Sequence, residues 1–306
     1  MLSYTLRRLA LTIPVLLGVA TLVFLLLHFV PGDPAVSMLG EGARTEDVEA
    51  LRTKLGLDQP ILKQYGAFLG NLAQGSLGTS FRFGTPVMKE IATRLPATLR
   101  LAAAAMLVAT LVAIPLGIVA AIFKGRAPDQ LAMTSAVIGL SLPSFWLGPM
   151  LALVFSVELG WFPVSGSGSL AHLVLPATTL GLALSALLAR MTRTTLLDEI
   201  KELYVLAARA RGRARWAAVV MHAFRNSLIP VVTVIGLQFG AVLTGSIITE
   251  TIFAWPGVGR LLVTAINSRD YPVVQGCILW IAVIYVGVNL LTDLVYGMLD
   301  PRIRYE

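Results

Sequence analysis

The stretch LALTIPVLLGVATLVFLLLHFV, residues 9–30, decides the fold class of this chain. It contains no Asp, Glu, Lys or Arg. A membrane-spanning α-helix needs about 20 consecutive, mostly apolar residues, so the segment predicts a transmembrane helix. A cleaved signal peptide is the alternative, because Arg7 and Arg8 precede the run. The run ends in PGDP, however, without an A-x-A cleavage site, which favours the transmembrane helix.

The rest of the chain has the same apolar character. Hydrophobic residues make up 56% of the 306 residues and charged residues 13%, whereas soluble domains average about 45–50% and about 25%. Five further apolar windows qualify as spans, so the sequence predicts an all-α membrane protein with six transmembrane helices. The fourth window is short, and Pro176 and Gly181 predict a backbone break within it. The five windows are residues 98–123, 131–157, 173–189, 228–248 and 277–298.

Most basic residues of the short connecting segments fall on one side of this six-span arrangement, and Arg260 and Arg269 lie on the other. The opposite loop, residues 158–172, has no Lys or Arg. Since cytoplasmic loops carry the excess of Lys and Arg, both termini and the loop 190–227 are expected in the cytoplasm. This topology accounts for the net charge of +7 without a nucleic-acid surface. The residues on the basic side are Arg7, Arg8, Lys124, Arg126, Arg190, Arg193, Lys201, Arg209, Arg211, Arg213, Arg215, Arg225, Arg302 and Arg304.

Residues 31–97 form a long polar loop on the outer side. Thr45 is expected to N-cap a helix with Glu46 and Asp47 in its first turn, and Gly56 is expected to end it. A second amphipathic helix is expected from Pro60 to just before Gly75. The two helices either pack on the spans or form a docking surface for an external partner. The chain is thus expected to consist of a first span (residues 1–30), an extracytoplasmic loop region (31–97) and a core of five transmembrane helices (98–306) that includes the cytoplasmic loop 190–227.

Motifs for catalysis and metal binding are missing from the sequence. It contains neither a G-x-x-x-x-G-K-[ST] phosphate loop nor H-E-x-x-H. The three histidines are scattered, and the single cysteine, Cys277, cannot form an internal disulfide. No catalytic residue, metal site or bound cofactor is therefore predicted. A membrane-embedded enzyme and an inert anchor or scaffold are the rival classes to a transporter.

Polar side chains within the spans mark a candidate translocation path. A carboxylate inside a span is costly and often functional; Asp293, near the cytoplasmic end of the sixth span, either takes such a role or pairs with an arginine. Small polar residues either hold helices together or jointly line a wet path. The candidates for the path or a gate are Ser141, Pro143, Phe145, Gln238, Ser246, Glu250 and Asp293.

The stretch LAARARGRARW, residues 206–216, places four arginines at alternate positions. On one helix, residues two apart point in nearly opposite directions, so these arginines make no single stripe for a phosphate backbone. Gly212 is expected to bend the chain and separate two short helices. The alanines between the charges leave a low surface that another protein can approach closely. This pattern favours a protein-docking element.

The stretch LAARARG, with RNSLIPVV downstream, resembles the cytoplasmic coupling loop of ABC importer permeases, E-A-A-x-x-x-G followed by I-x-L-P. Leu206 stands where that motif has glutamate. PGDP, LGLDQP, GSLGTS, SLPSFWLG, GLQFGAVLTGSIITETIFAWPGVGRLL, RDYPVVQG and DPRIRY extend the resemblance over essentially the whole chain. They are similar to the first permease subunit of the dipeptide, oligopeptide and nickel branch. The coupling-loop residues that the resemblance implies are Ala207, Ala208, Arg209, Arg211, Gly212, Arg213, Arg225, Asn226 and Pro230.

The resemblance implies a type I importer permease in the bacterial inner membrane. Its partners would be a second, homologous permease subunit, two ATPase subunits that bind ATP and Mg²⁺, and an extracytoplasmic substrate-binding protein. This chain itself would bind no cofactor and no nucleic acid. The implied cargo is a dipeptide, a longer peptide or glutathione. A nickel chelate is the alternative, which the lack of a His or Cys cluster in the spans makes less favoured.

Overall fold

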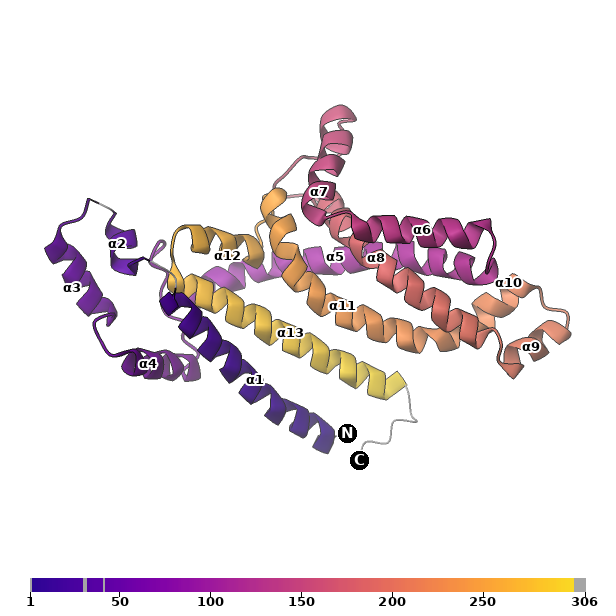
Figure 1. The fold of residues 1–306 in the computed structure, drawn as a ribbon, viewed down its shortest axis with the longest axis horizontal. Coiled ribbons are helices and arrows are strands. Elements are labelled where there is room, and N and C mark those ends of the chain that lie inside the picture. Colours follow the sequence, from indigo (N-terminus) through magenta and orange to yellow (C-terminus); the bar gives the residue numbers. More distant parts are fainter. Residues whose placement is uncertain (1, 30–31, 41, 300–306) are drawn as a thin grey trace. The chain divides into compact units, whose positions relative to one another are not determined.

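The computed structural model describes residues 2–29, 32–40 and 42–299, without the side chains of residues 2–10, 26–27, 29, 37 and 293–299. Within these ranges the regular elements are helical, and an isolated bridge joins Thr79 and Pro86. The elements are α1 (Leu2–Phe29), α2 (Pro34–Leu39), α3 (Thr45–Leu55), α4 (Ile61–Ala73), α5 (Val87–Ile122), α6 (Ala127–Ser141), α7 (Ser144–Ala152), η1 (Leu153–Glu158), α8 (Ala171–Glu199), α9 (Leu203–Ala210), α10 (Arg215–Ala218), η2 (Val219–Ala223), α11 (Phe224–Ile252), α12 (Val258–Asn267) and α13 (Tyr271–Leu299), shown in Figure 1.

The predicted spans correspond to helices of the structure. Four helical stretches, α5, α8, α10 to α11 and α13, are long and apolar enough to cross a membrane. The bent pair of α6 with α7 and η1 supplies a fifth span, and α1, with its apolar part at Leu11–Leu25, corresponds to the first predicted window. The predicted all-α membrane fold is therefore confirmed. Most helices run beyond their apolar windows, because helical hydrogen bonding continues into the polar flanks.

The prediction for the third span was wrong in one respect. Residues 131–157 are not one straight helix, because the axes of the two halves differ by 99°. Proline has no N–H and disfavours helical backbone in the residue before it. Leu142 accordingly takes an extended conformation (φ −82°, ψ 118°), and Pro143 precedes the first turn of α7. The break lies at these two residues.

The prediction for the fourth span was wrong in the opposite sense. α8 is one helix of 29 residues, and neither Pro176 nor Gly181 interrupts it. Pro176 lies in the second turn, where little of the helix precedes it. Gly181 instead allows close packing: a Cβ at this position would lie 2.7 Å from Val108 Cβ and 2.8 Å from the Ala105 carbonyl oxygen, both on α5. α8 also includes Arg190 and Arg193, which the sequence had assigned to a loop.

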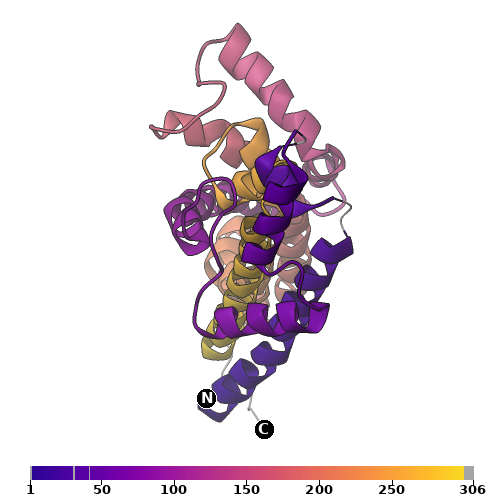
Figure 2. The same cartoon turned by 90° about the vertical axis from the view of Figure 1, so that its left-hand side faces the viewer.

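The chain divides into two compact units. The first comprises the described residues of Met1–Ala97 and Pro256–Ile284. The predicted outer-loop helices are present in it as α3 and α4, and Gly56 ends α3 in the left-handed conformation (φ 69°) as expected. The prediction that Thr45 is the N-cap was wrong, because Arg44 takes that position and Thr45 is the first residue of α3. Phe24 of α1 contacts Tyr65 and Phe68 of α4, with ring centroids 5.2 and 5.6 Å apart. Figure 2 shows α4, in purple, lying across the indigo α1.

The second unit comprises Thr98–Trp255 with the described residues of Tyr285–Glu306. α8 is its central element and packs against α6, α7 and α11 (Figure 1). Small side chains fill much of this core, which includes Ala113, Ala186 and Ala189. On α5, Gly117 makes a second close approach to α8, where a Cβ would lie 2.6 Å from Thr192 Cβ and 2.9 Å from the Ala189 carbonyl oxygen.

Candidate functional site

The segment between α8 and α11 begins with two short helices that turn at Gly212. The Gly212 N–H donates to the Arg209 carbonyl at 2.9 Å, and the Arg213 N–H donates to the Ala208 carbonyl at 3.3 Å. These two bonds form a Schellman motif, in which a left-handed residue ends the helix. Gly212 has φ +86°, a conformation that glycine adopts without steric cost. The bend that the sequence predicts at Gly212 is therefore present.

One side of this loop is packed into the second unit. Val205 and Ala208 of α9 belong to a buried cluster with Leu196 of α8, Ala121 of α5 and Ala223 of η2. The sequence interpretation had placed Ala208 on the docking surface together with Ala207. That interpretation was wrong for Ala208, which is 2% exposed, while Ala207 is exposed. Apolar contacts with other helices determine which side of α9 is buried. The coupling-loop motif alone does not specify these contacts.

Polar contacts reinforce the apolar attachment of α9. The Tyr204 hydroxyl donates a hydrogen bond to the carboxylate of Glu199 at the end of α8. Burial, followed by the hydrogen bond to Glu199, raises the pKa of Tyr204 to about 12. Asn226, predicted for the coupling loop, is exposed in the first turn of α11.

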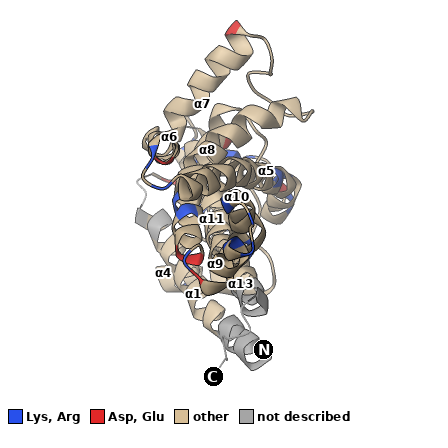
Figure 3. Cartoon of the chain, turned by 90° about the vertical axis from the view of Figure 1, so that its right-hand side faces the viewer, with Lys and Arg blue, Asp and Glu red and all other residues tan. Residues whose placement is uncertain are grey.

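The opposite side of the loop is exposed, basic and partly apolar. Figure 3 shows the arginines of α9 and α10 in blue. Arg211 donates to the Ala207 carbonyl at 3.3 Å, which leaves most of its guanidinium facing outward. Large apolar side chains accompany the charges, with Leu206 44% and Trp216 62% exposed. The further exposed residues here are Ala207, Arg209, Ala210, Gly212, Arg213, Ala214, Arg215 and Arg225.

Sequence reasoning missed the apolar part of this surface. It treated Leu206 as a departure from a glutamate motif and gave Trp216 no role. The exposure of Leu206 and Trp216 depends on how α9 and α10 pack against the long helices. The alternating arginines of the sequence do not indicate this packing. Exposed aromatic and aliphatic side chains beside arginines are typical of the anchor residues of protein–protein interfaces.

Two of the predicted path residues come together at the end of α11. Glu250 is fully buried and accepts a hydrogen bond from the Thr98 hydroxyl of α5 at 2.7 Å. Ser246, one turn earlier, contacts the same carboxylate oxygen at 3.4 Å. Gln238 lies about two turns before Ser246 in α11. Both polar atoms of its buried side chain lack a hydrogen-bond partner within the described part of the chain.

The other path candidates lie elsewhere. Ser141, Pro143 and Phe145 flank the break between α6 and α7, where the Ser141 hydroxyl donates to the Val137 carbonyl at 2.9 Å and Phe145 is exposed. The side chain of Asp293 lies outside the described residues. Pro230, assigned to the coupling loop, lies inside α11 in its second turn.

One ion pair links α6 to α8 and was not anticipated. Arg193 donates two hydrogen bonds of 2.7 Å to the two carboxylate oxygens of Asp129. The Gly125 N–H donates to the same carboxylate at 2.9 Å. The pair fixes the start of α6 against α8, although 64 residues separate the partners. Their opposite charges give no sign in the sequence that they are neighbours.

Comparison with known proteins adds a family to this geometry. Residues 113–305 match the family described as binding-protein-dependent transport system inner membrane component. Residues 1–102 match the N-terminal family of the same kind of membrane component. The chain belongs to this permease family. The permease is accordingly a multi-pass inner-membrane protein of a transport system that depends on a binding protein.

Relatives of the permease match over its full length. It is 46% identical to the glutathione transport system permease protein GsiC of Escherichia coli O6:H1 (strain CFT073), with 100% of both chains covered. It is 45% identical to the proteins of the same name from Escherichia coli strain K12 and Salmonella paratyphi A, with the same coverage. These relatives are named as transport permeases.

Solved structures support the fold of the permease. A structure of the MetNI methionine ABC transporter in inward-facing conformations matches with a TM-score of 0.57 at 19% identity, covering 70% of this chain and 97% of that one. An amino acid ABC transporter crystallised with histidines matches with a TM-score of 0.50 at 15% identity, covering 71% and 95%. The permease therefore shares the helical fold of type I ABC importer permeases.

Proposed function

We propose that this permease carries glutathione, or a closely related short peptide, into the cell. The observation that carries the proposal is the 45–46% sequence identity with permeases named for glutathione transport. The alignments cover the full length of both chains. A nickel chelate is less favoured, because these full-length relatives are named for a peptide.

The permease acts in a complex. A second, homologous permease subunit completes the translocation path, and two ATPase subunits bind ATP and Mg²⁺ and hydrolyse the nucleotide. A substrate-binding protein delivers the cargo from outside. The family description supports the binding protein. The lack of a phosphate-loop motif in this sequence agrees with ATP hydrolysis in separate subunits.

The exposed face of α9 and α10 is the surface that contacts an ATPase subunit. It combines arginines with the apolar side chains of Leu206 and Trp216, and Gly212 turns the chain between the two helices. In this arrangement the loop and both termini lie in the cytoplasm, as the distribution of Lys and Arg indicates.

The attachment of the loop explains how a push from an ATPase subunit reaches the spans. Val205 and Ala208 pack in one cluster with Leu196 of α8 and Ala121 of α5, and Phe224 of α11 packs against the same cluster. Tyr204 also donates a hydrogen bond to Glu199 of α8. Displacement of α9 therefore moves the ends of three long helices together. Nucleotide binding in the partner subunits biases these helices between an inward-open and an outward-open arrangement.

Reconstitution tests the proposed substrate. The complete complex would be placed in proteoliposomes with ATP inside and the cognate binding protein outside, and the uptake of labelled glutathione would be followed. We expect uptake that needs both ATP and the binding protein. Uptake of a nickel chelate under these conditions, without uptake of glutathione, would replace the peptide with the metal complex as the cargo.

A further inference from the structure

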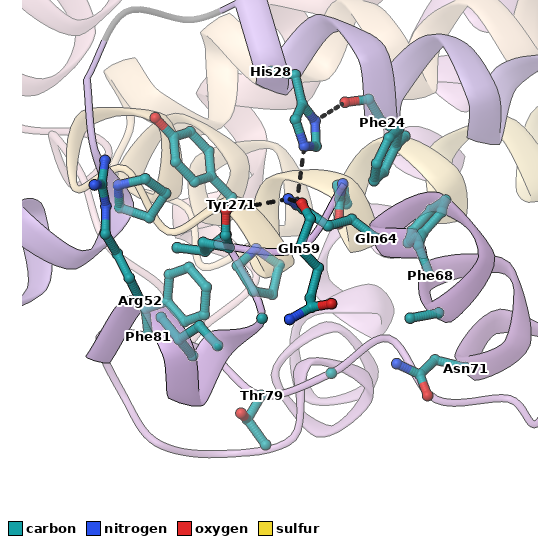
Figure 4. Close-up of a pocket in the computed structure, with 18 of the residues that line it drawn as sticks. Phe24, His28, Arg52, Gln59, Gln64, Phe68, Asn71, Thr79, Phe81 and Tyr271 are labelled. Carbon is teal, nitrogen blue, oxygen red and sulfur yellow. Dashed lines mark hydrogen bonds between the residues drawn. The ribbon is translucent and has the colours of Figure 1, made fainter. Parts of the chain in front are cut away.

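A pocket of about 780 Å³ with a mixed polar and apolar lining lies entirely within the first unit (Figure 4). Ligand sites in proteins are commonly cavities of about 300–1,000 Å³. Its walls come from the end of α1, the segment before α2, the connection of α3 to α4, the loop 76–81 and the start of α13. Segments that are distant in the sequence therefore build a cavity large enough for a tripeptide.

The walls of the pocket are held in place by internal contacts. Beside Phe81, the carboxylate of Asp270 accepts hydrogen bonds from the Ser80 hydroxyl and from the N–H groups of Phe81 (3.0 Å) and Arg82 (3.1 Å). On another wall, Gln64 donates to the carbonyls of Leu57 at 3.3 Å and Gln59 at 2.8 Å. A cavity that is formed before binding reduces the ordering cost of taking up a ligand.

One buried polar atom in the wall of the pocket makes no hydrogen bond within the described residues. The hydroxyl of Tyr271 is buried and has no hydrogen-bond partner within the described part of the chain. Tyr271 lines the pocket, and Figure 4 shows it with Arg52 and Gln59 among the surrounding side chains. Buried hydroxyl groups are nearly always hydrogen-bonded. Because the hydroxyl is covered in the structure, a rotation of the Tyr271 side chain would bring it to a polar ligand in the pocket.

The charges of the pocket specify the kind of ligand. Two cationic side chains, Arg52 and Lys63, and one carboxylate, Asp33, line it. Arg52 and Asp33 form an ion pair at 2.7 Å, whereas Lys63 is exposed and forms no ion pair with any residue that the structure describes. A complementary ligand carries an ammonium and a carboxylate close together, as in a free amino-acid group, and a second carboxylate for Lys63.

We propose that this pocket is a binding site for the cargo on the permease itself, and that its ligand is a short peptide with two carboxylates and one ammonium group. The assignment rests on the proposed function, since glutathione has this set of charges. Its amino-acid end would meet the Arg52–Asp33 pair, its other carboxylate would meet Lys63, and an amide oxygen would accept from Tyr271. The site would hold cargo that the binding protein has released.

Binding to the complete complex tests the site. The complex would be purified in lipid nanodiscs without its binding protein and titrated with reduced glutathione by calorimetry. We expect one saturable site per complex. Lys63→Gln should weaken the affinity about tenfold, and Tyr271→Phe should weaken it about threefold, as expected for the loss of a charged and a neutral hydrogen bond. Lys54→Gln is the matched control, because Lys54 is exposed on α3 and does not line the pocket.

The possible results separate this site from the proposed function. Absence of saturable binding, with normal uptake of glutathione in proteoliposomes, would remove the site and leave the function intact. Binding that is equal in the wild type and in both pocket variants would place the ligand elsewhere and also remove the site. Saturable binding with the expected losses, but without uptake, would keep the site and remove the function.

A segment of the binding protein is the competing occupant of the pocket. If Lys63→Gln weakened the association of the binding protein and left the affinity for glutathione unchanged, the pocket would hold that segment and our assignment would fail. Lys63 is exposed, so this variant should retain the wild-type fold. Thermal unfolding of the complex would verify this for each variant before the titrations.

Discussion

The Ser80 hydroxyl donates a hydrogen bond to the carboxylate of Asp270, although 190 positions separate the two residues. Both residues are buried. The same carboxylate accepts hydrogen bonds from the backbone N–H groups of Phe81 and Arg82. A single side chain just before α13 therefore determines the path of the distant loop 80–82.

Replacement of Asp270 with Ala should release this loop. Three donors would lose a charged acceptor, and we expect the free energy of unfolding to fall by at least about 2 kcal/mol. Hydrogen exchange followed by mass spectrometry should show faster exchange of the Phe81 and Arg82 amides. Asp58→Ala, at an exposed residue between α3 and α4, is the control. Unchanged exchange at both amides would show that the carboxylate does not hold the loop.

Replacement of Gly212 with Asp should break the coupling between the permease and the ATPase subunits. The residue has φ +86°, which a side chain makes costly by about 1 kcal/mol, and a carboxylate would draw the neighbouring arginines into ion pairs. We expect uptake and permease-stimulated ATP hydrolysis to fall to about a tenth or less, a factor that corresponds to only about 1.4 kcal/mol.

Gly84 offers a matched control for this experiment. It has φ +64° and open space around the position of a Cβ, as Gly212 has, but it belongs to the other unit. Gly84→Asp therefore adds similar backbone strain and the same charge away from the coupling loop. Equal losses of activity in the two variants would attribute the effect to general strain and remove the coupling role of Gly212.

The Tyr204 hydroxyl should make stability depend on alkaline pH. Its pKa is raised from 10.0 to about 12, so the folded state holds this proton more tightly than the unfolded chain does. The resulting stabilisation is complete below pH 10 and is lost as the pH rises through about 12. Absorbance titration of the tyrosinates in the detergent-solubilised complex should show a component near pH 12 that Tyr204→Phe removes. Persistence of the whole component in the variant would contradict the assignment.

Removal of one member of the Asp129–Arg193 pair should cost more than removal of both. Asp129→Asn leaves a partly buried guanidinium without its carboxylate, and we expect a loss of about 2–4 kcal/mol. Exchange of both residues for Met should be milder, since no unpaired charge remains. Arg193→Lys should cost less than Asp129→Asn, because an ammonium group replaces part of the two-point contact. Thermal unfolding of the wild type and the three variants would test this order, and a double variant less stable than Asp129→Asn would contradict it.

Local backbone chemistry made several features of the fold predictable. Gly56 and Gly212 end helices because a left-handed residue is needed there, and that need is expressed within a few residues of sequence. Apolar length in turn predicted the spans. The bend at Leu142 and Pro143 was missed because the apolar run continues through it, although Pro143 itself was visible. In α8 the reverse held, since Pro176 and Gly181 suggested a break that the helix does not have.

Features that depend on distant partners could not be predicted. Nothing near Asp129 in the sequence points to Arg193, and nothing in the loop motif shows that Ala208 faces inward while Leu206 and Trp216 face outward. The pocket of the first unit has the same origin, because Tyr271 reaches the side chains of Asp33, Arg52 and Lys63 only through the folded chain.

The two close approaches between α5 and α8, at Gly117 and Gly181, have a mechanical consequence. Each glycine leaves room for a β-branched side chain of the other helix, Thr192 or Val108, and for a backbone carbonyl oxygen beside it. Sliding of one helix along the other would drive these stiff side chains and carbonyls out of the two glycine positions. The two helices are therefore expected to move together as one rigid body. The conformational change needed for alternating access must then take place at other points, such as the bend between α6 and α7.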